Sequence, residues 1–520
     1  MGGGKAKSDN DRCLIGVDLG TTNLKAGLFN SAGAQLALSE ANFAIDRPLP
    51  GRAEQDPEEW WHALRKVFRD LIAQVPGARI SAIGICSQVG SQVFVDANMK
   101  ALTKVILWQD QRSANVIGPL NEKVQKIAGS FAPGYSVDTT SVVSRAEWAR
   151  VEQPSLWKET KFILSPKDYL NLLLTGEAGT DALSSIGLVD DSGHYLEALS
   201  ELVPNLIEIL PPLLDFRDAL GSVRDMGDTT IDSALKGAVV AVATMDAFGN
   251  LFGSGATSHG EAIEVAGTCE IVGVLSHENH PTKGVVTFPP VDGIRFHAGP
   301  TKSGGSALQW FSGIVGLPIA EVVERAEKAP PGSGGLIFLP YLEGERAPIW
   351  DDDVRGVFFG LSAEHGLEHL CRAVLEGVAF SARHLLEEID KASGFRSPAL
   401  RISGGGSRSD MCCQIRADIS GRSIERIHVR HSGVLGAALI AAVASGLAGD
   451  LKSAAAGLVH VERVFTPHEE LRSCYDNLYS IYRQLYPLLM PANSELAAFK
   501  HKDWSQTVTH YAESAQAVKR

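Results

Sequence analysis

The chain has 520 residues, 44% of them hydrophobic and 21% charged, a length and composition typical of a globular enzyme with two large domains. The formal net charge of -13 leaves no basic surplus for binding phosphate backbones, which argues against a nucleic-acid partner. Seven cysteines without a C-x-x-C pair, and no apolar run of about 18 residues, predict a cytoplasmic protein without a membrane partner.

A first α/β domain is expected over residues 13–260, after a polar, Gly-rich segment at 1–12 that predicts a disordered arm. A helix is expected over Pro57–Gln74, where apolar residues recur at helical spacing. Further helices are expected within 149–179, and residues 204–218 are expected to be irregular. The expected strands are 14–18, 25–29 and 35–41, which form a meander, then 80–86, 92–95 and 239–243.

The first strand ends in the run Asp18-Leu19-Gly20-Thr21-Thr22. Glycine allows a tight hairpin, and two hydroxyls with several free backbone N–H groups then suit a phosphate. Asp18 stands beside that turn, where a carboxylate can hold hydrated Mg²⁺. The alternative is an ordinary glycine turn.

A second α/β domain is expected over residues 261–491, and it opens with a similar signal. Residues 263–269 (Ile-Glu-Val-Ala-Gly-Thr-Cys) indicate a strand that ends in Gly267-Thr268. Two such hairpins, one in each half, suggest a duplicated fold that closes on a nucleotide. Helices are expected at Leu367–Ser393 and 433–445, and the tail at 492–520 is expected to be loosely ordered.

Asp246 follows the buried strand 239–243 and is the candidate catalytic base. A carboxylate at a strand end can face an interdomain cleft, where it accepts the proton of an alcohol during phosphoryl transfer. The alternative is that Asp246 caps the helix that Ala247-Phe248-Gly249 could start.

Two glycine-rich segments precede expected helices. Residues 404–409 (Gly-Gly-Gly-Ser-Arg-Ser) follow a short strand, and such a loop lets a planar or phosphorylated group lie against the backbone. Gly304-Gly305-Ser306 opens the segment that contains Gln309. The alternatives are a plain strand-to-helix connection for the first segment and close packing for the second.

A candidate sugar-binding segment contains Trp108, Asp110 and Arg112. An indole offers a flat face to the C–H surface of a sugar, and Asp and Arg can bind its hydroxyls. The loop Gln88-Val89-Gly90-Ser91 could line the same pocket. The alternatives are a partly buried Trp with a surface ion pair, and a polar turn.

Three further runs carry a family resemblance. Residues 356–361 (Gly-Val-Phe-Phe-Gly-Leu), followed by 369–376 (His-Leu-Cys-Arg-Ala-Val-Leu-Glu), agree in residue type and spacing with the C-terminal signature of the FGGY family of carbohydrate kinases. Residues 338–348 (Phe-Leu-Pro-Tyr-Leu-Glu-Gly-Glu-Arg-Ala-Pro) are similar to its xylulokinase-type members. The resemblance covers residues 13–490 and places the chain in the actin/hexokinase-like ATPase superfamily.

This resemblance implies two ribonuclease-H-like α/β domains of the actin/hexokinase type, with ATP and a sugar in a central interdomain cleft. It implies that Asp246 is the catalytic aspartate and that Asp18 holds Mg²⁺, through water. The implied nucleotide-side residues are Asp18, Gly20, Thr21, Thr22, Lys25, Gly267, Thr268, Gly305, Gln309, Gly405 and Ser409. The implied sugar-side residues are Gln88, Val89, Gly90, Trp108, Asp110, Arg112 and Asp246.

The expected activity is ATP-dependent transfer of the γ-phosphate to a terminal hydroxyl of a small ketose, such as the pentulose xylulose, or of a polyol. A glycerol- or erythritol-type polyol kinase or another ketose kinase is the alternative, followed by a non-catalytic sugar sensor or a chaperone-like ATPase. Xylulokinases typically have His where this chain has Gly90, a change expected to remove a hydroxyl partner and open space. They have Asn at Ala247, so a second polar contact is missing. The sequence does not decide between a monomer and a homodimer.

Overall fold

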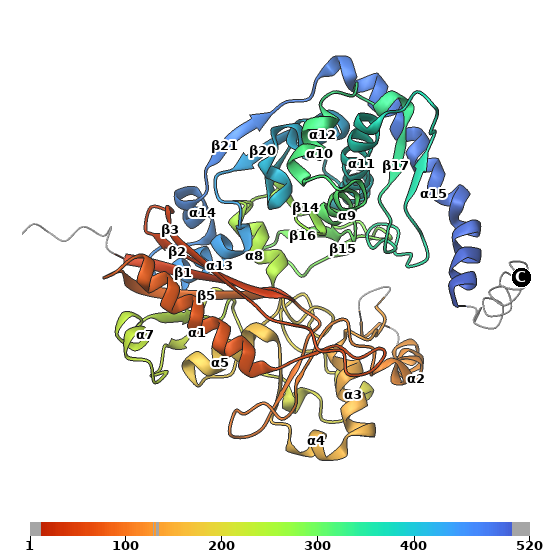
Figure 1. Ribbon diagram of the computed structural model, residues 1–520. Coiled ribbons are helices and arrows are strands. Elements are labelled where there is room, and N and C mark those ends of the chain that lie inside the picture. Colours follow the sequence, from red (N-terminus) through yellow and green to blue (C-terminus); the bar gives the residue numbers. More distant parts are fainter. Residues whose placement is uncertain (1–11, 128, 132–134, 502–520) are drawn as a thin grey trace, which may run out of the picture.

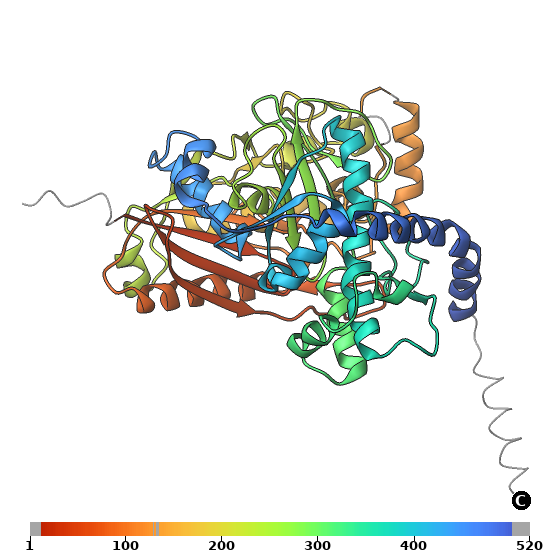
Figure 2. The same cartoon turned by 90° about the horizontal axis from the view of Figure 1, so that it is seen from above.

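Two mixed β-sheets form the centres of two lobes, one from each half of the chain (Figure 1). The computed structural model describes residues 12–127, 129–131 and 135–501. Figure 2 shows the same two lobes from above, with helix α15 extending beyond the second lobe. The arm expected at residues 1–12 therefore lies outside the described residues, apart from Arg12.

The first lobe alternates strands with helices, as the sequence predicts. Its elements are β1 (Arg12–Leu19), β2 (Asn23–Asn30), β3 (Gln35–Asn42), β4 (Glu54–Gln55), α1 (Pro57–Gln74), β5 (Arg79–Ser87), β6 (Val93–Val95), β7 (Val105–Ile106), α2 (Ala114–Lys126), α3 (Val142–Glu152), α4 (Pro154–Glu159), β8 (Phe162–Leu164), α5 (Pro166–Thr175), β9 (Thr180–Asp181), α6 (Leu199–Leu202), η2 (Ile207–Ile209), β10 (Leu213–Leu214), β11 (Ala219–Ser222), α7 (Thr229–Ala234), β12 (Val239–Ala241) and α8 (Asp246–Gly253).

The second lobe repeats this alternation. Its elements are β13 (Ala262–Ala266), β14 (Glu270–Ser276), β15 (Val286–Thr287), β16 (Arg295–Pro300), α9 (Gly305–Val315), α10 (Ile319–Ala326), η3 (Ser333–Gly335), β17 (Ile337–Leu339), β18 (Val357–Phe359), α11 (Leu367–Ser393), β19 (Ala399–Ser403), η4 (Gly405–Arg408), α12 (Asp410–Ser420), β20 (Ser423–Ile427), α13 (Ser432–Ala444), α14 (Leu451–Leu458), β21 (Val461–Phe465), η5 (Glu469–Leu471) and α15 (Arg472–His501).

The two sheets share one topology. In the first sheet, three antiparallel strands (β3, β2, β1) are followed by β5 and β12, each parallel to its neighbour. In the second sheet, β16, β14 and β13 form the antiparallel part, and β19 and β20 are the parallel strands. This repetition confirms the duplicated α/β fold predicted from the two Gly-Thr hairpins.

Helix α13 joins the two lobes. It follows β20 of the second sheet, yet it packs against β1, β5 and α8 of the first lobe. Glycines make this approach possible, because a Cβ on Gly16 would lie 1.8 Å from the Val434 carbonyl oxygen and one on Gly84 2.0 Å from that of Ala437. Where α8 crosses α13, a Cβ on Gly436 would lie 1.8 Å from the carbonyl oxygen of Gly249. These contacts fix the base of the first lobe to a segment of the second half of the chain.

The tail differs from the expectation. Helix α15 continues through Pro491 to His501, so the prediction of loose order from residue 492 is wrong for residues 492–501. The helix is anchored by the buried rings of Tyr475 and Tyr482, and its later part contains good helix formers, which propagate an established helix. Residues 502–520 lie outside the described part of the chain.

Candidate active site

Strand register brings Asp18 and Asp246 to the same edge of the first sheet. Asp18 lies opposite Cys86 in the parallel pair β1–β5, and Ser87 at the end of β5 forms a parallel bridge with Met245. Adjacent strands are about 4.8 Å apart, so the backbones that carry the two carboxylates are separated by roughly 10 Å. Asp246 is the first residue of α8, with Met245 as its N-cap, so the alternative role of Asp246 as the capping residue is wrong.

The two carboxylates share an environment that disfavours their ionisation. Burial, with a further contribution from the charge of Asp18, raises the pKa of Asp246 to about 7. Burial raises the pKa of Asp18 to about 6, and the charge of Lys25 opposes this shift. Within the described residues, neither carboxylate forms an ion pair or accepts a side-chain hydrogen bond. This pair can therefore take up a proton or face a cation.

A buried charge network holds the segment that precedes Asp246. The Lys167 ammonium, 0% exposed, lies 2.5 Å from a carboxylate oxygen of Asp168 and 2.9 Å from one of Asp181. Thr244 in turn donates a hydrogen bond of 2.8 Å to Asp181. Although burial alone would lower the pKa of Lys167, the two carboxylates hold it above its ordinary value. Sequence reasoning missed this network; its only signal is a Lys-Asp pair inside an apolar segment.

The first hairpin is hydrogen-bonded to the predicted sugar-side residues. The Thr21 hydroxyl donates to Gln88 Oε1 (2.9 Å) and accepts from the Trp108 indole N–H (3.0 Å). Gly20 closes the turn with a backbone hydrogen bond of 2.9 Å to Asn23, and Thr22 is exposed beyond it. The structure thus brings together the phosphate-type turn and the candidate sugar segment.

Asp110 and Arg112 are engaged with each other rather than exposed. Asp110 is 0% exposed, and its two oxygens accept hydrogen bonds from the Arg112 guanidinium and from the backbone N–H groups of Ala53 and Arg112. Arg112 also pairs with Glu54 at 2.6 Å and lies over the Trp148 ring. The Asp110 oxygens and the Nε and Nη2 groups of Arg112 are thus already used, which leaves the partly exposed Trp108 as the open face of this segment.

The expectation of free space at Gly90 is wrong. Its φ of +77° lies in the left-handed region. A Cβ at this position would lie 3.1 Å from Thr140 and 3.2 Å from Trp108. The glycine therefore allows two segments to pack closely, and Val89 beside it is half-buried.

The second hairpin is enclosed by the two glycine-rich loops. Gly305 donates its N–H to the Gly267 carbonyl (2.8 Å), and Ser306 donates to that of Thr268 (3.0 Å). A Cβ on Gly404, whose φ is +85°, would lie 2.6 Å from the carbonyl oxygen of Ala266. A Cβ on Gly305 would lie 2.9 Å from the Gly267 carbonyl oxygen, which confirms the close-packing alternative for this glycine.

The remaining nucleotide-side residues lie around this hairpin. A Cβ on Gly405 would meet nothing within 4 Å, so that position faces open space. Ser409 is the N-cap of α12 and accepts a hydrogen bond from the Cys412 N–H. Gln309 is exposed on α9, next to Trp310. These positions are accessible to a ligand on the side of the second lobe.

A hydrogen-bonded chain links the two lobes beneath Asp246. Asn250 donates to the Asp246 carbonyl (2.9 Å) and accepts from the Ser432 hydroxyl (2.7 Å). Ser432 is also bonded to Ser403, at the end of β19 in the second sheet (2.8 Å). A Cβ on Gly433 would lie 2.7 Å from a carboxylate oxygen of Asp18. The start of α13 therefore contacts the candidate catalytic groups and the second sheet at once.

Arg346, to which sequence reasoning assigned no role, reaches from the second lobe to the first. Its guanidinium lies 4.8 Å from the centre of the Trp108 ring. Its charge also lowers the pKa of the Cys269 thiol, against the larger opposing effect of burial. In the described part of the chain the guanidinium forms no hydrogen bond or ion pair. The sequence signal that could have found it is the Gly-Glu-Arg run at 344–346.

The residue before Arg346 is a buried acid. Glu345 is 1% exposed, and one of its oxygens accepts from the backbone N–H groups of Lys302 (2.5 Å) and Arg346 (2.8 Å). Its other oxygen makes no regular hydrogen bond within the described residues. Burial raises the pKa of Glu345 to about 7. This carboxyl group fixes the backbone from which the Arg346 side chain extends.

Comparison with known proteins assigns the chain to a family. Residues 13–231 match the N-terminal domain of the FGGY family of carbohydrate kinases, and residues 262–445 match its C-terminal domain. The chain belongs to this family. It is a sugar kinase, with ATP as the phosphoryl donor and a small-molecule sugar as the acceptor.

Relatives of this FGGY kinase include a xylulose kinase of Lactococcus lactis, 30% identical over 501 residues that span 94% of this chain and 99% of that protein. The structure of a xylulose kinase from Rhodospirillum rubrum, 27% identical, matches with a TM-score of 0.81 over 93% of this chain and 100% of that one. The ligand-bound xylulose kinase from Lactobacillus acidophilus has the same fold, with a TM-score of 0.84 at 24% identity over 93% of this chain and 100% of that one. The two-domain fold, the family and the sugar kinase activity predicted from sequence are thus confirmed.

The described residues contain no single helix long and apolar enough to cross a membrane. Only α9 and α10 taken together reach the required length and apolarity, and they are bent by 94° at their junction.

Proposed function

We propose that this FGGY kinase phosphorylates a pentulose such as xylulose at a terminal hydroxyl, with Asp246 as the general base. The observation that carries the proposal is the Asp246 carboxyl group itself. It stands at a strand end beside the first hairpin, without an ion-pair partner among the described residues, and its pKa is raised to about 7. A base with a pKa near the working pH is suited to accept a proton as a bond forms.

In the proposed step, a terminal hydroxyl oxygen of the sugar attacks the γ-phosphorus of ATP. The new O–P bond forms as the bond between the γ-phosphorus and the β,γ-bridging oxygen breaks, and ADP leaves. The hydroxyl proton passes to Asp246. Since this chemistry needs alignment and charge stabilisation more than covalent help, one base and well-placed cations are sufficient.

Mg²⁺ fits the chemistry of Asp18. Its carboxylate accepts no side-chain hydrogen bond in the described residues, and only the nearby charge of Lys25 counters its burial. A carboxylate of this kind suits a magnesium ion held through water. When bound, the ion supplies positive charge for the ATP phosphates. Asp18 is the protein group that would hold it, and removal of Mg²⁺ is expected to abolish turnover.

We assign the other residues by their position around the two hairpins. The backbone turns at Thr21, Thr22, Gly267 and Thr268 are proposed phosphate contacts, and Gln309, Gly405 and Ser409 are proposed contacts on the nucleoside side. The indole of Trp108 is proposed to carry the sugar. Since the oxygens of Asp110 and the Nε and Nη2 groups of Arg112 are already engaged, we revise their role to positioning of Trp108.

Arg346 is proposed as an additional electrophilic group. Its guanidinium lies over Trp108, close enough to the second hairpin to affect Cys269, and has donors left without acceptors in the described residues. A guanidinium presents a planar fork of N–H groups that matches phosphate oxygens. At this position it would bind the transferring phosphoryl group from the second lobe.

The pentulose substrate rests on the xylulose kinases among the relatives and on the compact surroundings of Trp108. We place the boundary between the two domains at residue 260, in the segment between α8 and β13. We further propose that the enzyme acts in the cytoplasm, where the cysteine usage fits a reducing environment.

The test is a coupled ADP-release assay with Mg²⁺-ATP across ketopentoses, ketohexoses, alditols and aldoses. The proposal expects the highest kcat/KM for a ketopentose and a product phosphorylated at the terminal carbon, identified by NMR. A preference for glycerol or erythritol would replace the pentulose with a polyol. ADP release that no sugar stimulates would overturn the proposed reaction altogether.

A further inference from the structure

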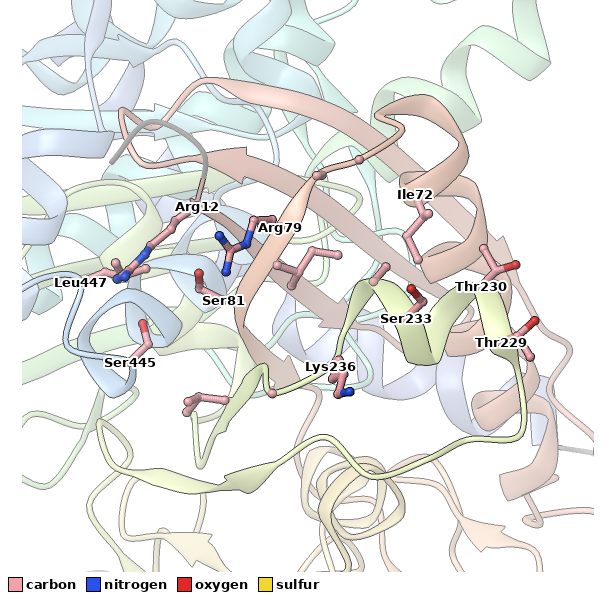
Figure 3. Close-up of a pocket in the computed structure, with 16 residues that line it drawn as sticks. Arg12, Ile72, Arg79, Ser81, Thr229, Thr230, Ser233, Lys236, Ser445 and Leu447 are labelled. Carbon is pink, nitrogen blue, oxygen red and sulfur yellow. The ribbon is translucent and has the colours of Figure 1, made fainter. Parts of the chain in front are cut away.

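A pocket of about 800 Å³ lies at the opposite edge of the first sheet from Asp18 and Asp246. It is formed by the amino ends of β1 and β5, by α7, and by the turn that follows α13 (Figure 3). Pockets of about 300–1,000 Å³ are the usual size for small-molecule ligands. No residue proposed for the kinase reaction lines it.

Two arginines at one end of this pocket lie next to each other without a counter-charge among the described residues. Arg12 and Arg79 are register partners at the start of the parallel pair β1–β5. Like charges held close together on neighbouring strands repel each other. Within residues 12–127, 129–131 and 135–501, neither guanidinium forms a hydrogen bond or an ion pair. The fold therefore keeps two exposed cations together at a cost that a bound anion would remove.

The surroundings of the two arginines add cations and hydroxyls rather than acids. Lys236 lines the same pocket, and among the lining residues there is no Asp or Glu. Figure 3 shows Arg12, Arg79, Ser81 and Ser445 at one end of the pocket and the threonines of α7 at the other. This positive, hydroxyl-rich concavity occurs on a chain whose net charge is -13.

We propose that this pocket is a second ligand site, which binds a small phosphate-bearing molecule. Guanidinium groups pair with phosphate oxygens in a bidentate manner, and Ser hydroxyls can donate to further oxygens. The acidic balance of the whole chain and the concave shape of the pocket favour a small anion over a nucleic acid.

The site is separate from the cleft. Ser445 and Leu447 follow the last turn of α13, whose first turn contacts Asp18. The 13 residues of α13 span about 20 Å at a rise of 1.5 Å per residue. A ligand in the pocket therefore does not compete directly with ATP or the sugar.

The test measures pyrophosphate binding by isothermal titration calorimetry while a non-hydrolysable ATP analogue, Mg²⁺ and the sugar fill the cleft. The proposal expects one pyrophosphate per chain, and at least tenfold weaker binding in the double variant Arg12→Gln, Arg79→Gln. A matched control, Lys283→Gln with Lys328→Gln, removes the same charge from exposed positions elsewhere and is expected to bind like the wild type.

If pyrophosphate binds too weakly for calorimetry, thermal unfolding with and without pyrophosphate provides a second test. Because the arginines repel each other, the Arg12→Gln, Arg79→Gln variant is expected to have a Tm equal to or above that of the wild type. Added pyrophosphate is expected to raise the Tm of the wild type and of the control, with the cleft filled, but not that of the double variant. Absence of binding, or equal binding by the double variant and the control, would overturn the proposal.

Discussion

In the first lobe, the turn after β1 is bordered by Asp18 and Asp246, two acids without ion-pair partners among the described residues. In the second lobe, the turn after β13 is bordered by Glu264 and Glu270, which both pair with the buried Arg416. The two turns occupy equivalent positions in sheets of the same topology. The acids themselves are at different positions, because Asp18 lies near the end of β1 and Asp246 begins α8, whereas Glu264 and Glu270 are on β13 and β14. They also differ in charge balance.

The presence or absence of an ion-pair partner separates the proposed catalytic acids of the first lobe from the structural acids of the second lobe. Burial raises the pKa of Asp18 to about 6 and that of Asp246 to about 7, and neither has an ion-pair partner among the described residues, so protons and cations can bind there. Burial also raises the pKa of Glu270, to about 8, but this carboxylate is paired with Arg416. Glu264 lies 2.5 Å from Arg416 and is held as part of a buried triad. A duplicated fold can thus keep reactive carboxyl groups in one lobe and use ion-paired ones to brace the other.

The largest expected effect is the loss of the unpaired acid at position 246. Asp246→Asn keeps the shape of the side chain and removes the base, so kcat is expected to fall by about 10³- to 10⁴-fold. Direct ADP detection with saturating sugar and ATP measures it. Near-wild-type turnover would remove Asp246 from the mechanism.

The thermal stability of Asp246→Asn provides a control for this prediction. A carboxyl group with a raised pKa in the folded state favours folding when protonated, and that contribution is lost as pH rises through about 7. Asp246→Asn has no such loss, so at pH 8 its Tm is expected to equal or exceed that of the wild type. A marked drop in Tm would indicate a structural role instead.

The reverse result is expected in the second lobe. Arg416→Met leaves Glu264 and Glu270 buried without their cation, and the free energy of unfolding is expected to fall by about 3–5 kcal/mol. Urea unfolding measures this change, and activity of the remaining folded enzyme below the transition is expected to stay within a few fold. A selective loss of kcat at unchanged stability would contradict the supporting role.

Arg346 tests whether the second lobe also contributes a reactive group. Arg346→Gln is expected to lower kcat by about 100-fold, because phosphoryl charge then lacks a guanidinium partner. Arg346→Lys keeps the charge and is expected to recover part of the loss. Equal kcat in the wild type and both variants would leave Arg346 as a packing residue on Trp108.

The smallest effects are expected for substitutions of Gly404 and Gly405, two neighbours that can be compared directly. Gly404→Ala places a Cβ against the Ala266 carbonyl at a positive φ and is expected to cost about 1–3 kcal/mol of stability. Gly405→Ala meets no protein atom within 4 Å, so stability is expected to change little while KM for ATP rises. Thermal unfolding and KM measurements separate the two, and equal destabilisation by both would contradict this account of the loop.

The sequence predicts the local features of this fold well, because they follow from short-range patterns. The strands expected at 14–18 and 25–29 are observed as Arg12–Leu19 and Asn23–Asn30, with the glycine turn between them. Gly90 shows where such prediction fails. A glycine in place of a larger residue suggests free space, but Thr140 and Trp108 from other segments pack against this position. Such packing is not encoded in the residues next to it.

Long-range partners are the features that sequence reasoning misses. The Ala-rich helix α13 is predicted, but its position on the opposite lobe depends on glycines as distant as Gly16 and Gly84. Lys167 and Arg346 each stand next to an acid in apolar or family-typical runs, and their roles depend on Asp181 and Trp108 across the fold. Their importance follows from tertiary contacts rather than local pattern.

The most direct measurement is the pH dependence of kcat/KM in the wild type and in Asp18→Asn, from pH 5 to 9, with ADP quantified directly. The wild type is expected to lose activity as pH falls below about 7, where Asp246 becomes protonated. Asp18→Asn, although slower, is expected to keep its activity to somewhat lower pH, because burial still raises the pKa of Asp246 but the added effect of the Asp18 charge is gone. If kcat/KM falls at the same acidic pH in both enzymes, or does not fall at acidic pH in either, the result would contradict the assignment of Asp246 as the base.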